Sequence, residues 1–431
     1  MRLPLPIVVA CLAAVPALHG RAAQPQDFAS ARAAAAALPR LHGLVVSHRG
    51  EIALEYYARG HSATRLQNIK SASKSLIAAL VGIAIERQLI PGLDTPIVRW
   101  FPELRKDADT RKQAITIEDL LTMRSGLAST SGGNYGPWVN SGNWVRYVLN
   151  RPMVSDPGTS MEYSTGTSHL LSAILTKATG KSTHQFAVET LAKPIGVTLP
   201  RWLRDPQGIY FGGNEMQMTP RQMIAVGELY KNRGRAGDRQ VVPAEWVEES
   251  CTPRTRSRWD SDREYGYGWW SQGFADHRAC FAWGFGGQYI FVFRELDLVV
   301  AIASSSTVSD ERRGYRRQLF NLLEDHILRP AAAAGAPLAG DLAGARGRRQ
   351  SSAAGHPLSR FEGWARSAYP LTTVVPPPRP AMTARAMIST SAMAPIAIQT
   401  GFVYQAPPSS VSMSISSLPD GGCGGCGGCP C

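Results

Sequence analysis

The chain has 431 residues, of which 44% are hydrophobic and 18% are charged, and its formal net charge is +13. This composition is ordinary for a folded soluble protein with a sizeable core. No segment approaches the roughly 18 uninterrupted apolar residues that a membrane-spanning helix requires, and the basic residues are scattered without interleaved aromatics, so the composition does not favour nucleic-acid binding.

The first residues, 1–23, have a short basic start, an apolar stretch and then small residues. This pattern predicts an export signal that is removed at about Ala22. We therefore expect a periplasmic or secreted protein without stable membrane insertion. The alternative is that Cys11 is a lipoprotein cysteine, although the apolar run before it is short.

Residues 27–330 form the predicted globular domain, in which strands and helices alternate with Gly, Pro and Asn turns. The stretch "LHGLVVSHRGEIALEYYARG" predicts a hairpin around an Arg-Gly turn. A helix is expected next, with Ser71 near its N-terminus. Capping residues and closing glycines predict three more helices, over residues 116–126, 164–180 and 219–234.

Two later segments are predicted to be strands: "YGYGWW", residues 265–270, and "QYIFVFRELDLVVAIASSS", a pair of strands that turns at residues 295–297. Strands at both ends of the domain with helices between them indicate one mixed sheet completed by distant parts of the chain, with a helical insertion. The fold class from this pattern is α+β.

Residues 128–144, "ASTSGGNYGPWVNSGNW", lack periodicity and are long for a connection inside a compact domain. Such a segment favours a binding loop or a lid. Tyr135, Trp138 and Trp144 could line a pocket there, or they could simply anchor the loop in the core.

Two cysteines, Cys251 and Cys280, lie in the body of the chain. In an exported protein they could form one disulfide, and the alternative is two separate buried thiols.

Residues 331–431 are rich in Ala, Gly, Ser and Pro and are predicted to be a disordered tail. The tail ends in "GGCGGCGGCPC". Its Cys-x-x-Cys spacing is compatible with metal ligation, but a glycine tract offers no supporting shell, so we expect no metal site and a tail without catalytic consequence.

Ser71 and Lys74 form the one Ser-x-x-Lys pair of the chain. Residues three apart share a helix face, so an amine at position 74 can reach a hydroxyl at position 71 and act as its activating base. Burial and the positive helix end both favour a neutral amine. The alternative is a capping serine beside a surface lysine.

The chain resembles the penicillin-recognising serine hydrolases, in the class C β-lactamase-like branch, over roughly His42 to Arg317. The motifs that carry the resemblance are "SASKSLIAALVGIAI", "ITIEDLLTMRSGL", "DPGTSMEYSTG", "MTPRQMIAVGELYKNRG" and "WGFGGQYIFV". The 6-aminohexanoate-dimer hydrolase and esterase members are the most similar. The resemblance implies an antiparallel sheet flanked by helices, with a helical subdomain.

By this resemblance, Ser71 is the nucleophile, Lys74 its base and Tyr163 the tyrosine of the family's Tyr-x-Asn motif. A phenol there can relay a proton to the leaving group. The third position of that motif is Thr165 instead of Asn, which argues against binding of a β-lactam side-chain amide. Without the resemblance, Tyr163 would be interpreted as a packing residue.

The family's third motif carries Lys-Thr-Gly or His-x-Gly, whereas the matching stretch "AWGFGGQ", residues 282–288, has neither Lys nor His. Gly286 and Gly287 would let a substrate approach the backbone. The oxyanion donors are expected to be the N–H groups of Ser71 and of Gln288, or of Phe285 if the register shifts. The alternative is a glycine-rich bend at a sheet edge.

These observations predict a serine hydrolase that needs no cofactor and cleaves a small amide or ester through an acyl-serine, as 6-aminohexanoate-oligomer hydrolases do. A carboxylesterase or a D-amino-acid peptidase of the same fold is the alternative, and a non-catalytic envelope binding or sensor protein is the alternative of another class. His169 and His184 lie in helical patterns and are expected to be packed or surface residues, not metal ligands.

Overall fold

The computed structural model describes residues 28–258, 260–307 and 312–335. The predicted signal, Cys11 and residues 336–431, with the four terminal cysteines, lie outside the described residues. The tail was expected from residue 331, whereas helix α11 (Arg329–Gly335) continues past that point and buries Ala331. The first residues assigned to the tail are therefore helical.

The centre of the domain is an eight-stranded sheet in the order β2-β1-β12-β11-β10-β9-β8-β7. Its ladders are all antiparallel, so the expectation of a mixed sheet was wrong. The first strand of the chain, β1, pairs antiparallel with the last, β12. The strands are β1 (Leu41–His48), β2 (Glu51–Tyr57), β7 (Thr255–Arg256), β8 (Glu264–Tyr265), β9 (Trp270–Phe274), β10 (His277–Gly284), β11 (Gln288–Phe293) and β12 (Leu298–Ser304).

Strand β12 shows why the sheet needs covering on both faces. Leu298, Val300 and Ile302 belong to one buried cluster, while Val299 and Ala301 belong to a second cluster on the other face. A strand that is apolar at every position cannot leave either face in water.

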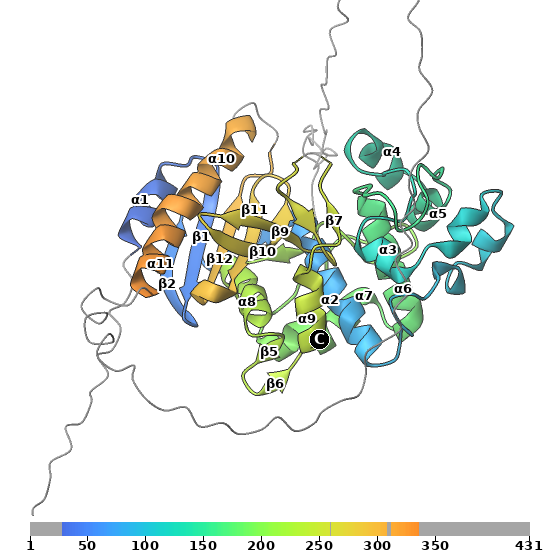
Figure 1. Ribbon diagram of the computed structural model, residues 1–431, viewed down its shortest axis with the longest axis horizontal. Helices are drawn as coiled ribbons and strands as arrows, with labels where there is room; N and C mark the ends of the chain where they lie inside the picture. Colours follow the sequence, from blue (N-terminus) through green and yellow to red (C-terminus); the bar gives the residue numbers. More distant parts are fainter. Residues whose placement is uncertain (1–27, 259, 308–311, 336–431) are drawn as a thin grey trace, which may run out of the picture. The chain divides into compact units, whose positions relative to one another are not determined.

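Helices cover both faces (Figure 1). Helices α1, α10 and α11 pack on one face, and α2, α8 and α9 on the other. A helical subdomain containing α3 to α7 adjoins α2. The bounds are α1 (Ala29–Ala36), α2 (Ser73–Glu86), α3 (Ile117–Leu121), α4 (Tyr135–Val139), α5 (Trp144–Leu149), α6 (Thr165–Thr179), α7 (Thr183–Ala187), α8 (Pro220–Lys231), α9 (Ala244–Cys251) and α10 (Arg312–Leu323).

The predicted caps explain where these helices begin. Thr116 and Thr219 both form capping boxes, and Gly180 follows α6 in the left-handed conformation. The helix predicted to run to Gly126 ends instead at Leu121, because Met123 already has a φ of 60°.

The segment predicted as one strand, residues 265–270, is interrupted: Tyr265 ends β8, Trp270 begins β9, and residues 266–269 form a bend between them. Gly268 has a φ of 74°, and a Cβ there would lie 2.8 Å from Ala78 and 2.9 Å from the Lys74 carbonyl oxygen. The chain turns here because it packs directly on α2, a contact that strand periodicity cannot reveal.

The aperiodic segment 128–144 contains α4. Trp138 and Trp144 are 0% and 4% exposed, so these two rings anchor the segment in the core. Tyr135 stays half-buried, and its hydroxyl accepts a hydrogen bond from Asn214 at 2.9 Å.

Cys251 and Cys280 form a disulfide whose Cα atoms are 5.5 Å apart. It joins the end of α9 to β10. Of the two alternatives that the sequence left open, the structure has the bridge.

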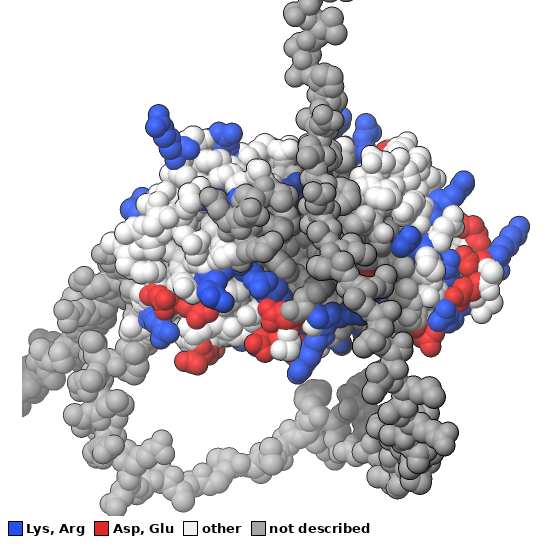
Figure 2. All heavy atoms as spheres, turned by 90° about the horizontal axis from the view of Figure 1, so that it is seen from above, with Lys and Arg blue, Asp and Glu red and all other residues white. Residues whose placement is uncertain are grey.

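No helix in the described ranges is both long and apolar enough to cross a membrane. On the face shown in Figure 2, Lys and Arg side chains alternate with Asp and Glu instead of forming one continuous basic surface. The described residues also form exposed ion pairs, such as Arg111 with Asp109 at 2.6 Å.

Candidate active site

Ser71 lies in a single turn of 3₁₀ helix, Lys70–Ala72, directly before α2. Lys70 has a φ of 51°, a conformation that a side-chain-bearing residue adopts at a cost. Its backbone N–H donates to Asn68 Oδ1 at 2.9 Å, and its Nζ forms an ion pair with Glu215 at 3.2 Å. These contacts hold the turn that presents the half-buried Ser71.

Lys74 is the second residue of α2 and only 3% exposed. Its Nζ lies 3.0 Å from Ser71 Oγ, 3.3 Å from Thr165 Oγ1 and 2.7 Å from the carbonyl oxygen of Gly213. These partners are uncharged, and burial lowers the pKa of Lys74 to about 7. The amine is therefore poised to exchange a proton with Ser71 near neutral pH.

Tyr163 lies two residues before the start of α6, and its side chain faces Ser71 and Lys74. Its ring centroid lies 5.1 Å from Lys74 Nζ, and its hydroxyl is hydrogen-bonded to Ser71. Part of the ring reaches the surface, but burial around the hydroxyl raises the pKa of Tyr163 to about 12. The phenol therefore keeps its proton at neutral pH and can donate it.

A set of hydroxyls fixes Tyr163 and the start of α6. Ser129 Oγ donates to the Tyr163 carbonyl oxygen at 2.6 Å, and Ser131 Oγ accepts from the Thr165 N–H at 2.9 Å. Thr130 Oγ1 accepts from the Gly166 N–H at 2.9 Å. The aperiodic segment thus contributes to the site through its backbone-binding hydroxyls.

Gly213 approaches Lys74 closely because it has no side chain. A Cβ there would lie 3.1 Å from Lys74 Nζ and 2.9 Å from Ser168 Cβ. The neighbouring Gly212 N–H donates to His169 Nδ1 at 3.3 Å, and His169 Nε2 lies 3.0 Å from Asp205 Oδ2. His169 is thus a fully buried packing residue that holds the bend bearing the Gly213 carbonyl.

The third-motif stretch closes the site on the side of the sheet. A Cβ at Gly284 would lie 2.1 Å from the Ile69 carbonyl oxygen, so the end of β10 touches the backbone just before Ser71. Phe285 follows Gly284 directly and its side chain is 40% exposed. Gln288, the first residue of β11, pairs with Gly284. Its side-chain amide donates to the Ser304 carbonyl oxygen and accepts from the Ser304 N–H.

Gly286 and Gly287 have φ values of 89° and 102°. A Cβ at Gly286 would lie 2.6 Å from the Ser305 carbonyl oxygen, and one at Gly287 would lie 2.8 Å from Leu319. Protein packing and the turn conformation therefore account for both glycines. The sequence had suggested close approach of a substrate.

The sheet topology, the helix covering and the motif order can now be compared with known proteins. The family model described as Beta-lactamase matches residues 31–325. The chain belongs to the Beta-lactamase family. This match confirms the family resemblance and the α+β fold class that were predicted from the sequence.

Solved structures with this fold support the assignment. A Bacillus anthracis protein provisionally assigned as a 6-aminohexanoate-dimer hydrolase has a TM-score of 0.57 at 19% identity, covering 67% of this chain and 80% of that chain. EstCE1, a hydrolase with promiscuous acyltransferase activity, has 0.56 at 18% identity, covering 69% and 97%. A D-stereospecific amidohydrolase from Streptomyces sp. has a TM-score of 0.53 at 16% identity, covering 70% of this chain and 99% of that chain. No protein of the curated set matches this chain significantly.

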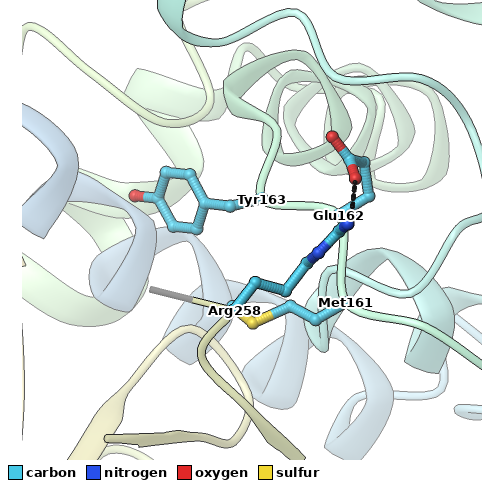
Figure 3. A pocket seen from close by; sticks show the side chains of 4 residues that line it. All are labelled: Met161, Glu162, Tyr163 and Arg258. Carbon is cyan, nitrogen blue, oxygen red and sulfur yellow. Dashed lines mark hydrogen bonds and ion pairs between the residues drawn. The ribbon is translucent and has the colours of Figure 1, made fainter. Parts of the chain in front are cut away.

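Two hollows are lined in part by residues of this Beta-lactamase-family site, one by Tyr163 and the other by residues 285–287. One, of about 270 Å³, is lined by Met161, Glu162, Tyr163 and Arg258 (Figure 3). The other, of about 330 Å³, lies beyond the glycine turn. Its lining is mainly aromatic and comprises Trp283, Phe285, Gly286, Gly287, Tyr289, Tyr315, Arg316 and Leu319.

The part of the chain that the structure describes holds no group of three or more His, Cys, Asp or Glu side chains suited to a metal ion. His184, like His169, is engaged by protein: its Nε2 lies 3.0 Å from the Leu199 carbonyl oxygen.

Ser71, Lys74 and Tyr163 lie together, as the helical spacing and the family resemblance had implied. The residues that support them were not predicted. The "STS" run at 129–131 and the glycine pair at 212–213 were visible as turn-like signals, yet nothing in the sequence linked them to Lys74 or Tyr163. Glu162 and Arg258 were also missed, because 96 residues separate them.

Proposed function

We propose that this chain is a serine hydrolase that cleaves an amide or ester bond through an acyl-Ser71 intermediate. The observation that carries the proposal is the contact between Ser71 Oγ and a buried Lys74 whose pKa is about 7. An exposed lysine would be almost fully protonated at neutral pH and could not accept the serine proton.

The reaction follows from these positions. Lys74 takes the Ser71 proton as Oγ attacks the substrate carbonyl, and the resulting oxyanion binds backbone N–H groups. We propose the N–H of Ser71 and that of Phe285 or Gln288 for this role. Phe285 is favoured because it follows the Gly284 contact with Ile69. Tyr163 then protonates the leaving amine or alkoxide and regains a proton from Lys74. The neutral Lys74 next takes a proton from water as that water attacks the acyl-Ser71 ester, which releases the acid and restores the Ser71 hydroxyl.

Among substrates we propose a small linear amide of the 6-aminohexanoate-oligomer kind, with esters and D-amino-acid amides as the alternatives. The named structural relatives support this range of chemistry. The absence of Lys and His from residues 282–288 argues against a dedicated β-lactamase. A chromogenic cephalosporin that is turned over as fast as an ester would reverse this order.

The test is labelling and turnover of the full chain. A fluorophosphonate probe and a nitrophenyl ester should label and acylate the wild type, and Ser71→Ala should abolish both. Ser75→Ala is the matched control, because the Ser75 hydroxyl is committed to the Gly268 carbonyl oxygen at 2.6 Å. If the probe does not label the folded wild-type protein, the alternative of a non-catalytic binding or sensor protein is favoured.

We also propose that the protein is exported and loses its first residues at about Ala22. The disulfide between Cys251 and Cys280 supports an oxidising compartment. The mass of protein recovered outside the cytoplasm, compared with that of the full chain, tests this proposal. A full-length mass would contradict the predicted cleavage.

A further inference from the structure

The hollow beside Tyr163 carries a pair of opposite charges. Arg258 Nη1 lies 2.9 Å from Glu162 Oε2, and both side chains line the hollow with Met161. In Figure 3 the Tyr163 hydroxyl points away from this pair, so the ring lies between the reacting end of the site and the two charges.

The two partners differ in how firmly they are held. Glu162 precedes Tyr163 directly, its backbone N–H donates to the Met123 carbonyl oxygen at 2.7 Å, and its side chain is 24% exposed. The Arg258 side chain is 66% exposed. An exposed guanidinium with several N–H donors can change partners at little cost.

A second arginine nearby does not have this freedom. Arg263 is 3% exposed, its guanidinium carbon lies 4.7 Å from the Trp283 ring centroid, and it is paired with Asp260 at 3.0 Å. It also contacts the ring of Trp270, which is stacked on Tyr163. Arg263 therefore has a packing role, and Arg258 is the cation at the mouth of the hollow.

Resting on the proposed hydrolase function, we propose that Arg258 binds a carboxylate on the leaving group of the substrate. Tyr163 protonates the leaving group, so that half of the substrate lies beside Tyr163, which also lines the hollow. Arginine binds carboxylates through paired N–H donors. Glu162 holds the guanidinium until the substrate carboxylate replaces it.

This assignment names a substrate class: an acyl amine or acyl alcohol whose leaving half ends in a carboxylate. It also explains how a chain without Lys or His at residues 282–288 can still recognise an anion. The cation would be Arg258, which follows β7 and lines the hollow beside Tyr163.

The experiment compares two phenyl esters that differ only in charge, 3-(4-butanoyloxyphenyl)propanoate and its neutral primary amide. Both release a phenol that is followed by absorbance. Arg258→Met should raise KM for the anionic ester roughly tenfold, with kcat nearly unchanged, and should leave the neutral ester within about twofold. Raising the salt concentration should weaken the wild-type preference, since the pair is exposed.

Arg256→Met is the matched control, because Arg256 lies two residues away, is 75% exposed and contacts Glu264 at 3.6 Å. It should not change the ratio of the two KM values. Glu162→Gln should lower KM for the anionic ester several-fold by removing the competing carboxylate.

Three outcomes would overturn the inference. They are equal effects of Arg258→Met on both esters, no effect on either, and the same shift in Arg256→Met. In each of these cases the wild type still hydrolyses esters, so the proposed function stands. If the wild type hydrolyses neither ester and Ser71 cannot be labelled, the proposed function fails and the inference fails with it.

Discussion

The pH dependence of acylation is the sharpest consequence of the buried Lys74. Lysine in water has a pKa of about 10.4, so at pH 7 fewer than about one amine in a thousand is neutral. With a pKa of about 7, the neutral fraction rises from about one tenth at pH 6 to about nine tenths at pH 8. The rate of acylation should follow that fraction.

The upper end of the profile is set by Tyr163. Its pKa is raised to about 12, so the phenol remains protonated far above neutral pH. We therefore expect kcat/KM to rise about tenfold between pH 6 and pH 8, with a midpoint near 7, and then to stay level to about pH 10.

The assay is the pre-steady-state burst of a nitrophenyl ester in buffers of constant ionic strength, corrected for spontaneous hydrolysis. Lys177→Arg is the control: this exposed lysine of α6 donates to the Trp100 carbonyl oxygen at 2.6 Å and should not move the midpoint. A midpoint above pH 9, or a flat profile, would refute the role of a neutral Lys74.

Two further variants test the supports of the site and of the sheet. Gly213→Ala should lower kcat at least tenfold with a small loss of stability, because the new Cβ would lie 3.1 Å from Lys74 Nζ; burst kinetics and thermal unfolding measure the two effects, and an unchanged kcat would contradict the packing argument. Cys251→Ser together with Cys280→Ser should lower the free energy of unfolding by about 3–4 kcal/mol, since the bridge closes a loop with a sequence separation of 29. Urea unfolding of the variant, compared with wild type in the absence of reductant, would show no difference if the bridge did not form.

The parts of the site that could be predicted from sequence are those fixed by local geometry. Ser71 and Lys74 are three residues apart on one helical turn, so their contact needs little help from the rest of the fold. The hairpin of β1 and β2 and the helices α6 and α8 were predicted for the same reason, because caps and turns are local signals.

Tyr163 shows the limit of such reasoning. Its position depends on the pairing of Ser129–Ser131 with the start of α6, a contact over 34 residues. Only the family resemblance connected it with Ser71. Gly213 is still further away in sequence, at a separation of 139 from Lys74, and no periodic pattern marks its carbonyl as a hydrogen-bond partner.

The errors in the predicted elements have a common physical cause. The bend at Gly268 arises where the backbone packs against α2. Helix α3 ends early, at Leu121, because Met123 has a positive φ. Apolar periodicity reports which face of an element is buried, but it does not report how closely two backbones approach.

The buried amine also makes a prediction about stability. Between pH 7 and 10.5 the unfolded chain binds a proton at Lys74 that the folded chain has lost, so the free energy of unfolding should rise with pH across this window. The lowered pKa corresponds to a cost of at most roughly 5 kcal/mol at neutral pH, relative to an uncharged side chain of similar size.

Lys74→Met removes that cost and with it the base. The variant also leaves the Gly213 carbonyl oxygen without the Lys74 hydrogen bond, which offsets about 1 kcal/mol of the gain. We therefore expect Lys74→Met to be inactive yet more stable than wild type at pH 6.5, with a difference that shrinks by several kcal/mol at pH 9.5. Urea unfolding at both pH values measures it. A difference that does not depend on pH would mean that the pKa of Lys74 is the same in the folded and the unfolded chain, and the argument for its neutral form would lose its basis.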